Sequence, residues 1–190
     1  MKKVEHGKTF DRNAANPPAF EIFHNTVTEG YPEHWHTAIE IIMPTRGEYE
    51  VVVGKDSYNL KEGDIIMINS GVVHGMRFVS QGERIVMLVE PGCVENQEEM
   101  ETIFLRLPAI YFKKEDEEDP FYLFLRSQIL ELVREYDNEG AVMTHRICTG
   151  LKELFSEFGR KGFSDANAQN TFGAMKQQEY IEAVLSVCRY

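Results

Sequence analysis

The sequence contains few cysteines and no long apolar run. Its three cysteines, Cys93, Cys148 and Cys188, are widely spaced and form no Cys-x-x-Cys pair. An odd number of separated cysteines argues against a disulfide framework or a zinc knot and favours reduced thiols. No apolar segment approaches the ~20 residues of a membrane-spanning helix, and residues 1–6 are too polar to begin a signal peptide. We therefore expect a cytoplasmic protein that has no membrane partner.

Basic residues are also scarce. Lys and Arg total 20 against 31 Asp and Glu, which gives a formal net charge of −11. A surface that binds the phosphates of a nucleic acid needs clustered Lys and Arg. We therefore do not expect this chain alone to bind DNA. The sequence also lacks a phosphate-binding glycine loop, a nucleophile elbow and a Walker pattern. Hydrophobic residues make up 43% of the chain, which is ordinary for a folded domain.

Short apolar segments separated by turn signals fill the chain from residue 20 to residue 89. Short strands at such regular spacing predict an antiparallel barrel or sandwich. The expected strands are residues 20–24, 38–43, 48–53, 58–60, 65–68, 72–79 and 84–89. Residues 1–19 are polar and end near two prolines, which indicates an N-terminal arm.

After Pro91-Gly92 the spacing of apolar residues changes to the 3.6-residue period of helices. Residues 97–107 fit a short helix, and the acidic run that follows fits a solvated linker. Asp119-Pro120 predicts an N-cap followed by proline in the first turn of a longer helix. A second amphipathic helix follows and is expected to end at Gly159. The predicted class is therefore mainly β with α, a barrel followed by an α-helical hairpin.

The two predicted long helices carry wide apolar stripes. Helices joined by a short polar connection pack as an antiparallel hairpin. The apolar positions are Phe121, Phe124, Leu125, Ile129, Leu132, Val133 and Tyr136 in the first helix, and Ile147, Leu151, Leu154, Phe155 and Phe158 in the second. These stripes offer more area than the flank of one small barrel is expected to cover, so we predict that the excess meets a symmetry mate in a homodimer.

Four side chains in two separate blocks are the strongest candidates for chemistry. They are His34, His36 and Glu40 in the first block and His74 in the second. Residues two apart on a strand share a face, so the first three would point the same way. Three imidazoles and a carboxylate suit one divalent transition metal such as Zn, Ni, Mn or Fe. The same side chains also suit the polar wall of a pocket for a small organic molecule.

The spacing of these blocks resembles the two motifs of the cupin family. The first is His34-x-His36-x3-Glu40-x6-Gly47, and the second is Gly63-x7-Gly71-x2-His74. The resemblance implies an antiparallel, jelly-roll-like cupin barrel. It also implies that a ligand inside the barrel would contact His34, His36, Glu40, His74, Met76 and Phe78.

The chain departs from the cupin pattern at three positions. The leading glycine is Gly30 rather than a residue two positions earlier, Asn69 replaces the usual proline, and Phe78 replaces the usual asparagine. In metal-using cupin enzymes that asparagine position supports the site by hydrogen bonding, which a phenylalanine side chain cannot do. The resemblance therefore implies the fold more firmly than the chemistry.

A barrel, a helical hairpin and a linker in this order resemble the N-terminal half of AraC-type transcription regulators. In that family the barrel senses a small effector, the hairpin mediates dimerisation, and a C-terminal pair of helix-turn-helix units reads DNA. The resemblance implies an effector-binding barrel at residues 1–92, a helical dimerisation region at 93–160, and at 161–190 a linker and the start of a truncated helix.

The expected function is thus the sensing and dimerisation module of a regulator, without enzymatic activity. Its partners would be a small-molecule effector and a second copy of the chain, and DNA would be reached only through the absent C-terminal domain. The alternative is a free-standing metal-dependent cupin enzyme, an oxygenase or an isomerase.

Overall fold

The computed structural model describes residues 19–26, 30–91, 109–114, 118–138 and 140–161 of the chain. Most of the predicted N-terminal arm, the short helix expected at residues 97–107 and the terminal segment 162–190 lie outside these described residues. Within the described part, no helix is long and apolar enough to cross a membrane.

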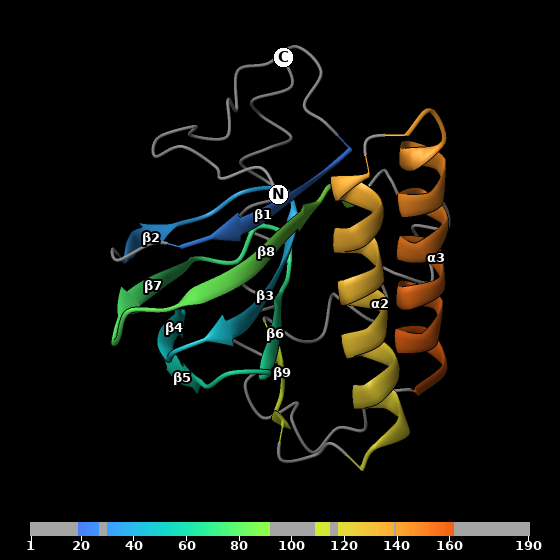
Figure 1. Cartoon of the computed structure of the whole chain (residues 1–190). Coiled ribbons are helices and arrows are strands. Elements are labelled where there is room, and N and C mark those ends of the chain that lie inside the picture. The colour runs from blue at the N-terminus through green and yellow to red at the C-terminus, as the bar shows by residue number, and fades with distance from the viewer. Residues whose placement is uncertain (1–18, 27–29, 92–108, 115–117, 139, 162–190) are drawn as a thin grey trace, which may run out of the picture.

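Two antiparallel sheets form the body of the protein (Figure 1). The first has the strand order β1-β8-β3-β6-β9, and the second has the order β2-β7-β4-β5. The strands are β1 Phe20–Asn25, β2 Tyr31–His34, β3 Ile39–Arg46, β4 Tyr49–Val53, β5 Asp56–Leu60, β6 Ile65–Ile68, β7 His74–Phe78, β8 Glu83–Val89 and β9 Ala109–Phe112. This arrangement confirms the predicted antiparallel barrel.

Alternation along the central strands divides the hydrophobic core into two clusters. On β3, Ile42 packs in the interior between the sheets, whereas Ile39 and Ile41 belong to the cluster that contacts the helices. The same alternation holds on β8, where Val86 faces the interior and Met87 faces the helices. Because successive side chains of a strand point to opposite faces, one strand serves both clusters.

The two predicted long helices are present as α2, Pro120–Asp137, and α3, Met143–Lys161. Asp119 caps α2 as predicted, because its carboxylate accepts a hydrogen bond from the backbone N–H of Phe121 at 2.8 Å. The prediction that the second helix ends at Gly159 is wrong, since α3 continues to Lys161. Glycine permits a helix end but does not require one.

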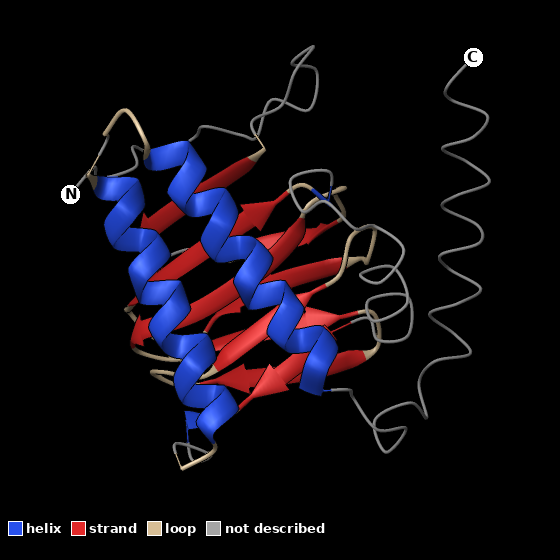
Figure 2. Ribbon diagram, turned by 90° about the vertical axis from the view of Figure 1, so that its right-hand side faces the viewer, coloured by secondary structure: helices blue, strands red, loops and turns tan. Residues whose placement is uncertain are grey.

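Both helices lie side by side across the outer face of the first sheet (Figure 2). Their apolar faces are buried there, at exposures of 0–3%. The buried residues are Tyr122, Leu125, Ile129, Leu132, Ile147, Leu151, Leu154 and Phe155. The barrel of the same chain therefore covers much of both predicted stripes. Other stripe positions, Phe121, Phe124, Val133 and Tyr136, are half-buried, and the side chain of Phe158 lies outside the described part of the structure. The homodimer stays a prediction.

Strand β9 was not predicted and lies within the region expected to be helical. It pairs with β6 and extends the first sheet, with Ile68 opposite Ala109 and Ile65 opposite Phe112. The hydroxyl of Tyr111 in this strand donates to Asp64 Oδ2 at 2.6 Å. A strand of four residues far from its partner in sequence carries little periodic signal of its own.

Docking of the hairpin onto the sheet predicts a large effect of truncating a helix residue in the core. Leu151→Ala should lower the free energy of unfolding by about 2–5 kcal/mol, because it leaves a cavity among buried side chains. Leu123→Ala is the matched control, since Leu123 is 49% exposed on α2, and should change stability by less than about 0.5 kcal/mol. Urea unfolding of both variants measures the difference, and equal effects would contradict the described packing.

Candidate metal and ligand site

The four predicted residues meet, but they do not come from one continuous strand. His34 ends β2 in the second sheet, and Glu40 lies on β3 in the first sheet. The chain crosses between the sheets over residues 35–38, and His36 lies in that crossing. The prediction of a single strand through the first motif is therefore wrong, although His34, His36 and Glu40 still converge. His74, at the start of β7, completes the cluster.

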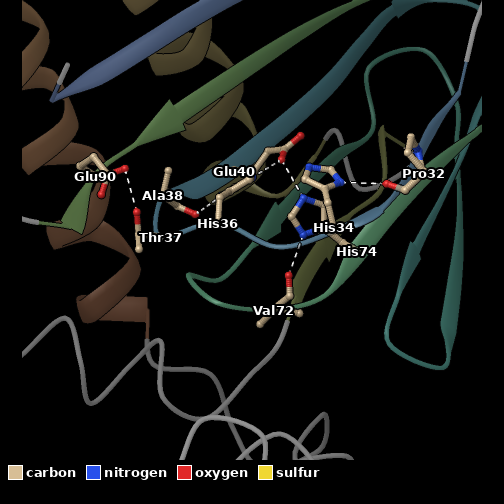
Figure 3. A network of polar contacts seen from close by, with 9 residues as sticks. All are labelled: Pro32, His34, His36, Thr37, Ala38, Glu40, Val72, His74 and Glu90. Atoms are coloured by element: carbon tan, nitrogen blue, oxygen red, sulfur yellow. Dashed lines mark hydrogen bonds and ion pairs between the residues drawn. The ribbon is translucent and has the colours of Figure 1, made fainter. Parts of the chain in front are cut away.

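The cluster is compact and centred on one carboxylate oxygen (Figure 3). One ligand atom from each of the four side chains lies within 4.8 Å of the others. Glu40 Oε2 is 2.9 Å from His36 Nε2 and also 2.9 Å from His74 Nε2. The ring centroids of His34 and His74 are 4.5 Å apart. His34 is half-buried, His36 is 9% exposed, and Glu40 and His74 are buried.

Each imidazole is oriented by a backbone carbonyl two residues away. His34 Nδ1 lies 2.9 Å from Pro32 O, His36 Nδ1 lies 2.9 Å from Ala38 O, and His74 Nδ1 lies 2.8 Å from Val72 O. A carbonyl oxygen can only accept, so each Nδ1 carries the proton and donates it. This fixes the tautomer and leaves Nε2 as the unprotonated nitrogen of each neutral ring, an arrangement typical of histidine metal ligands.

This tautomer makes the centre of the cluster a site for positive charge. The Nε2 atoms of neutral rings offer lone pairs, and two of them lie 2.9 Å from a carboxylate oxygen, which is also an acceptor. Acceptors approach so closely only when a proton or a metal cation lies between them. Three imidazole nitrogens and one carboxylate oxygen fit a divalent transition metal. The residues present therefore fit the cofactor that the sequence predicted.

The environment shifts the pKa of two members of the cluster. Burial by itself would raise the pKa of Glu40, but its close polar contacts with His36 and His74 outweigh burial and lower the pKa to about 2. Burial also lowers the pKa of His34, because the uncharged ring needs less solvation. Both shifts keep a carboxylate anion and a neutral imidazole at neutral pH, which are the states that bind metals.

Met76 and Phe78 were also predicted to contact a ligand, and the structure describes the side chain of Met76 alone. Met76 is buried on β7, two residues after His74, and so faces the barrel interior with it. Phe78 ends β7, but its side chain lies outside the described part of the structure. Contact of either residue with a ligand stays a prediction.

Sequence reasoning missed a buried arginine. Arg84 on β8 is 1% exposed and lies above the ring of Tyr49, with its Cζ atom 4.9 Å from the ring centroid. Alternation with Val86 and Leu88 places it on the interior face of the strand. That alternation was visible in the sequence, but an arginine beside a turn is usually solvated.

Comparison with known proteins supports the fold. Residues 25–90, which hold all four clustered side chains, match the family described as "Cupin domain". None of the curated proteins that were compared matches the sequence.

Two solved structures resemble this chain over most of its length. The AraC-like transcriptional activator CuxR is 10% identical, with 89% of this chain and 62% of that chain covered and a TM-score of 0.57. Apo ToxT K231A from Vibrio cholerae is 10% identical, with 88% and 66% covered and a TM-score of 0.50. This chain thus spans less than two thirds of the length of either structure.

Similarity to a metal-containing cupin is more limited. Oxalate decarboxylase from Bacillus subtilis, described with Mn(II) centres, is 17% identical, with 36% of this chain and 20% of that chain covered and a TM-score of 0.33. So partial a likeness carries no argument about chemistry. The family match supports a cupin barrel at residues 25–90. The whole fold, a barrel followed by helices, is shared with CuxR.

The depressed pKa of Glu40 predicts an acid-sensitive contribution to stability in metal-free protein. Its pKa falls from an ordinary value of 4.5 to about 2 on folding, so ionised Glu40 stabilises the fold fully above the unfolded value. That contribution is lost as the pH falls toward the folded value. Relative to Glu40→Gln, the wild-type protein should therefore lose stability between about pH 4.5 and pH 2. Urea unfolding in the presence of EDTA measures the free energy of unfolding of both proteins across this pH range. If the two free energies change with pH in parallel, the described contacts of Glu40 are contradicted.

Proposed function

We propose that this chain is the effector-sensing and dimerisation module of an AraC-type transcription regulator. The observation that carries the proposal is the extent of the likeness to the AraC-like activator CuxR, which covers 89% of this chain and so includes the helical hairpin as well as the barrel. The chain covers 62% of CuxR, which leaves room in such a protein for a further part. DNA would be read by that part, in agreement with the net charge of −11 here.

The site chemistry fits a sensor. Its side chains come from both sheets, and a ligand that binds them contacts both layers of the barrel at once. Oriented imidazoles and a carboxylate provide directional recognition inside an otherwise apolar interior. The module would bind a small-molecule effector and would not itself catalyse a reaction. The outward faces of the hairpin would then form the homodimer, since the inward faces are covered.

The same cluster favours a second candidate, a metal-dependent cupin oxygenase or isomerase. We infer that His34, His36, Glu40 and His74 hold one divalent transition metal such as Zn, Ni, Mn or Fe. When bound, such an ion supplies a Lewis acid that polarises a ligand oxygen. The protein's own contribution is to orient the three rings through their Nδ1 atoms and to keep Glu40 ionised. A sensor can use this chemistry to hold an effector without turning it over.

Metal removal gives a direct test of the inferred ion. Protein purified without an affinity tag should contain metal at near-unit stoichiometry, and EDTA should lower its melting temperature. At a free metal concentration 100 times the Kd, binding stabilises by about 2.7 kcal/mol. His36→Ala should abolish both the metal content and the EDTA effect. His145→Ala is the matched control because His145 is exposed on α3, away from the cluster.

Acid should also displace the metal, because protons compete for the same imidazole nitrogens as the pH falls below about 6.5. If the purified protein holds no metal and added Zn, Ni, Mn or Fe leaves the melting curve unchanged, the metal assignment is wrong. The four side chains would then act as the polar wall of an organic ligand pocket.

The regulator role predicts two further observations. The reading frame should continue beyond Tyr190 into two helix-turn-helix units, and this chain should sediment at micromolar concentration with twice its mass of 21.9 kDa. Sequencing and analytical ultracentrifugation test these outcomes. A stop codon directly after Tyr190 together with a monomer would instead favour the free-standing enzyme.

A further inference from the structure

A cleft opens at the seam where edge strands of the two sheets meet. Strand β5 is the last strand of the second sheet, and β9 is the last strand of the first. The hydroxyl of Tyr111 on β9 donates to the backbone carbonyl of Asn59 on β5 at 3.1 Å. The rings of Tyr58 and Tyr111 meet edge to face, with their centroids 5.6 Å apart. These residues line a cleft of about 560 Å³, a volume typical of sites for small organic molecules.

One buried carboxylate holds the walls of the cleft in place. Asp64, which is 5% exposed, accepts hydrogen bonds from the backbone N–H groups of Lys61 at 2.9 Å and Lys114 at 2.8 Å. It also accepts a hydrogen bond from the hydroxyl of Tyr111 at 2.6 Å. The same side chain therefore fixes the turn before β6, the chain beyond β9 and one aromatic wall.

The turn that carries Lys61 is anchored on both sides. The backbone N–H of Gly63 donates to the carbonyl of Pro44 on β3 at 2.8 Å, and the Gly63 carbonyl accepts from the hydroxyl of Tyr122 on α2 at 2.8 Å. Gly63 has a φ of 88°, and a Cβ atom there would lie 2.8 Å from Cδ of Lys114. Glycine thus permits both the turn and the position of the Lys114 stem. The frame of the cleft is tied to the first sheet and to the hairpin.

Three lysines place positive charge around the cleft. Lys61, Lys113 and Lys114 all line it and are exposed. Within the described part of the chain, Lys61 and Lys113 form no ion pair, whereas Lys114 Nζ lies 3.9 Å from Glu62 Oε1. All three lysines follow the ends of the edge strands. They are therefore not placed along the strands, where lysines keep the edge of a sheet from pairing with another chain.

The charges of the cleft favour an anion. Its lining carries three lysines against two acids, Glu62 and Asp64, in a chain whose formal net charge is −11. Asp64 is already engaged by three hydrogen-bond donors. Ammonium groups on flexible stems act as point charges that can gather around a carboxylate or a phosphate. Burial and the nearby Asp56 raise the pKa of Tyr58, so its hydroxyl stays protonated at neutral pH and can donate to an anion.

We propose that this cleft binds a small aromatic anion, a planar ring that carries a carboxylate or a phosphate group. The anionic group lies among the ammonium groups of Lys61, Lys113 and Lys114, and the ring packs against Tyr58 and Tyr111. The inference goes beyond the proposed function and does not rest on it, since the cleft and the histidine cluster share no residue.

The test compares aromatic anions with matched compounds on the intact chain. Isothermal titration calorimetry uses benzoate and phenyl phosphate as aromatic anions, acetate and inorganic phosphate as anions without a ring, benzamide as a neutral ring and benzylamine as a cation. We expect benzoate or phenyl phosphate to bind saturably, and the tighter of the two identifies the anionic group. The other four compounds should bind about 10-fold more weakly or not at all. Added salt should weaken the binding, because it screens exposed charges.

Variants assign the binding to the cleft. The double variant Lys61→Gln, Lys113→Gln should bind the anion about 3- to 30-fold more weakly, and Tyr58→Leu about 2- to 10-fold more weakly. The double variant should keep the wild-type melting temperature, because both lysines are exposed. Lys55→Gln is the matched control, since Lys55 is exposed in the turn before β5 and does not line the cleft. It should bind like the wild-type protein.

Each of the following results would overturn the proposed site. Neither aromatic anion binds; benzamide, benzylamine, acetate or inorganic phosphate binds as tightly as the aromatic anions; or the double lysine variant binds them unchanged. Loss of binding on addition of EDTA would also overturn it, because the anion would then be bound by a metal at the histidine cluster. None of these results decides the regulator role, which the reading frame beyond Tyr190 and the oligomeric state test separately.

Discussion

The structure depends on a buried carboxylate that the two sheets share. Glu40 stands on the first sheet, and one of its oxygens is the same distance from His36 in the crossing segment and from His74 on the second sheet. The charge of Glu40 is tolerable inside the barrel only because both rings stay in place. The rings are in turn held by backbone carbonyls. The cluster therefore acts as a unit. If His36 or His74 is lost, the buried charge of Glu40 loses one of its two partners.

Local signals in the sequence were sufficient for most of the elements and for the four clustered side chains. The spacing of the two motifs predicted that His34, His36, Glu40 and His74 would lie together. Asp119 preceding Pro120 located the start of α2, because both residue types act on the first helical turn itself. Each of these signals depends on neighbours within a few residues, or on a spacing that the fold imposes.

What the sequence could not show depends on distant contacts. Trp35 and Thr37 alternate like strand residues, yet the chain crosses between sheets there, and alternation does not record which sheet a residue joins. The area of sheet available to Leu151 and its neighbours likewise depends on how many strands lie beneath the helices, and β9 adds one of them. Arg84 was missed because its burial follows from the closure of the barrel rather than from its neighbours in the chain.

The alternation along β3 has a mechanical consequence. Glu40 lies between Ile39 and Ile41, which pack in the cluster formed with α2 and α3. Bond lengths and planar peptides make a strand nearly inextensible from one residue to the next. A movement of the Glu40 backbone would therefore be passed directly to the two isoleucines that support the helices, except for what the φ and ψ angles beside it take up. Adjacent residues of β3 thus link the clustered site to the packing of the hairpin.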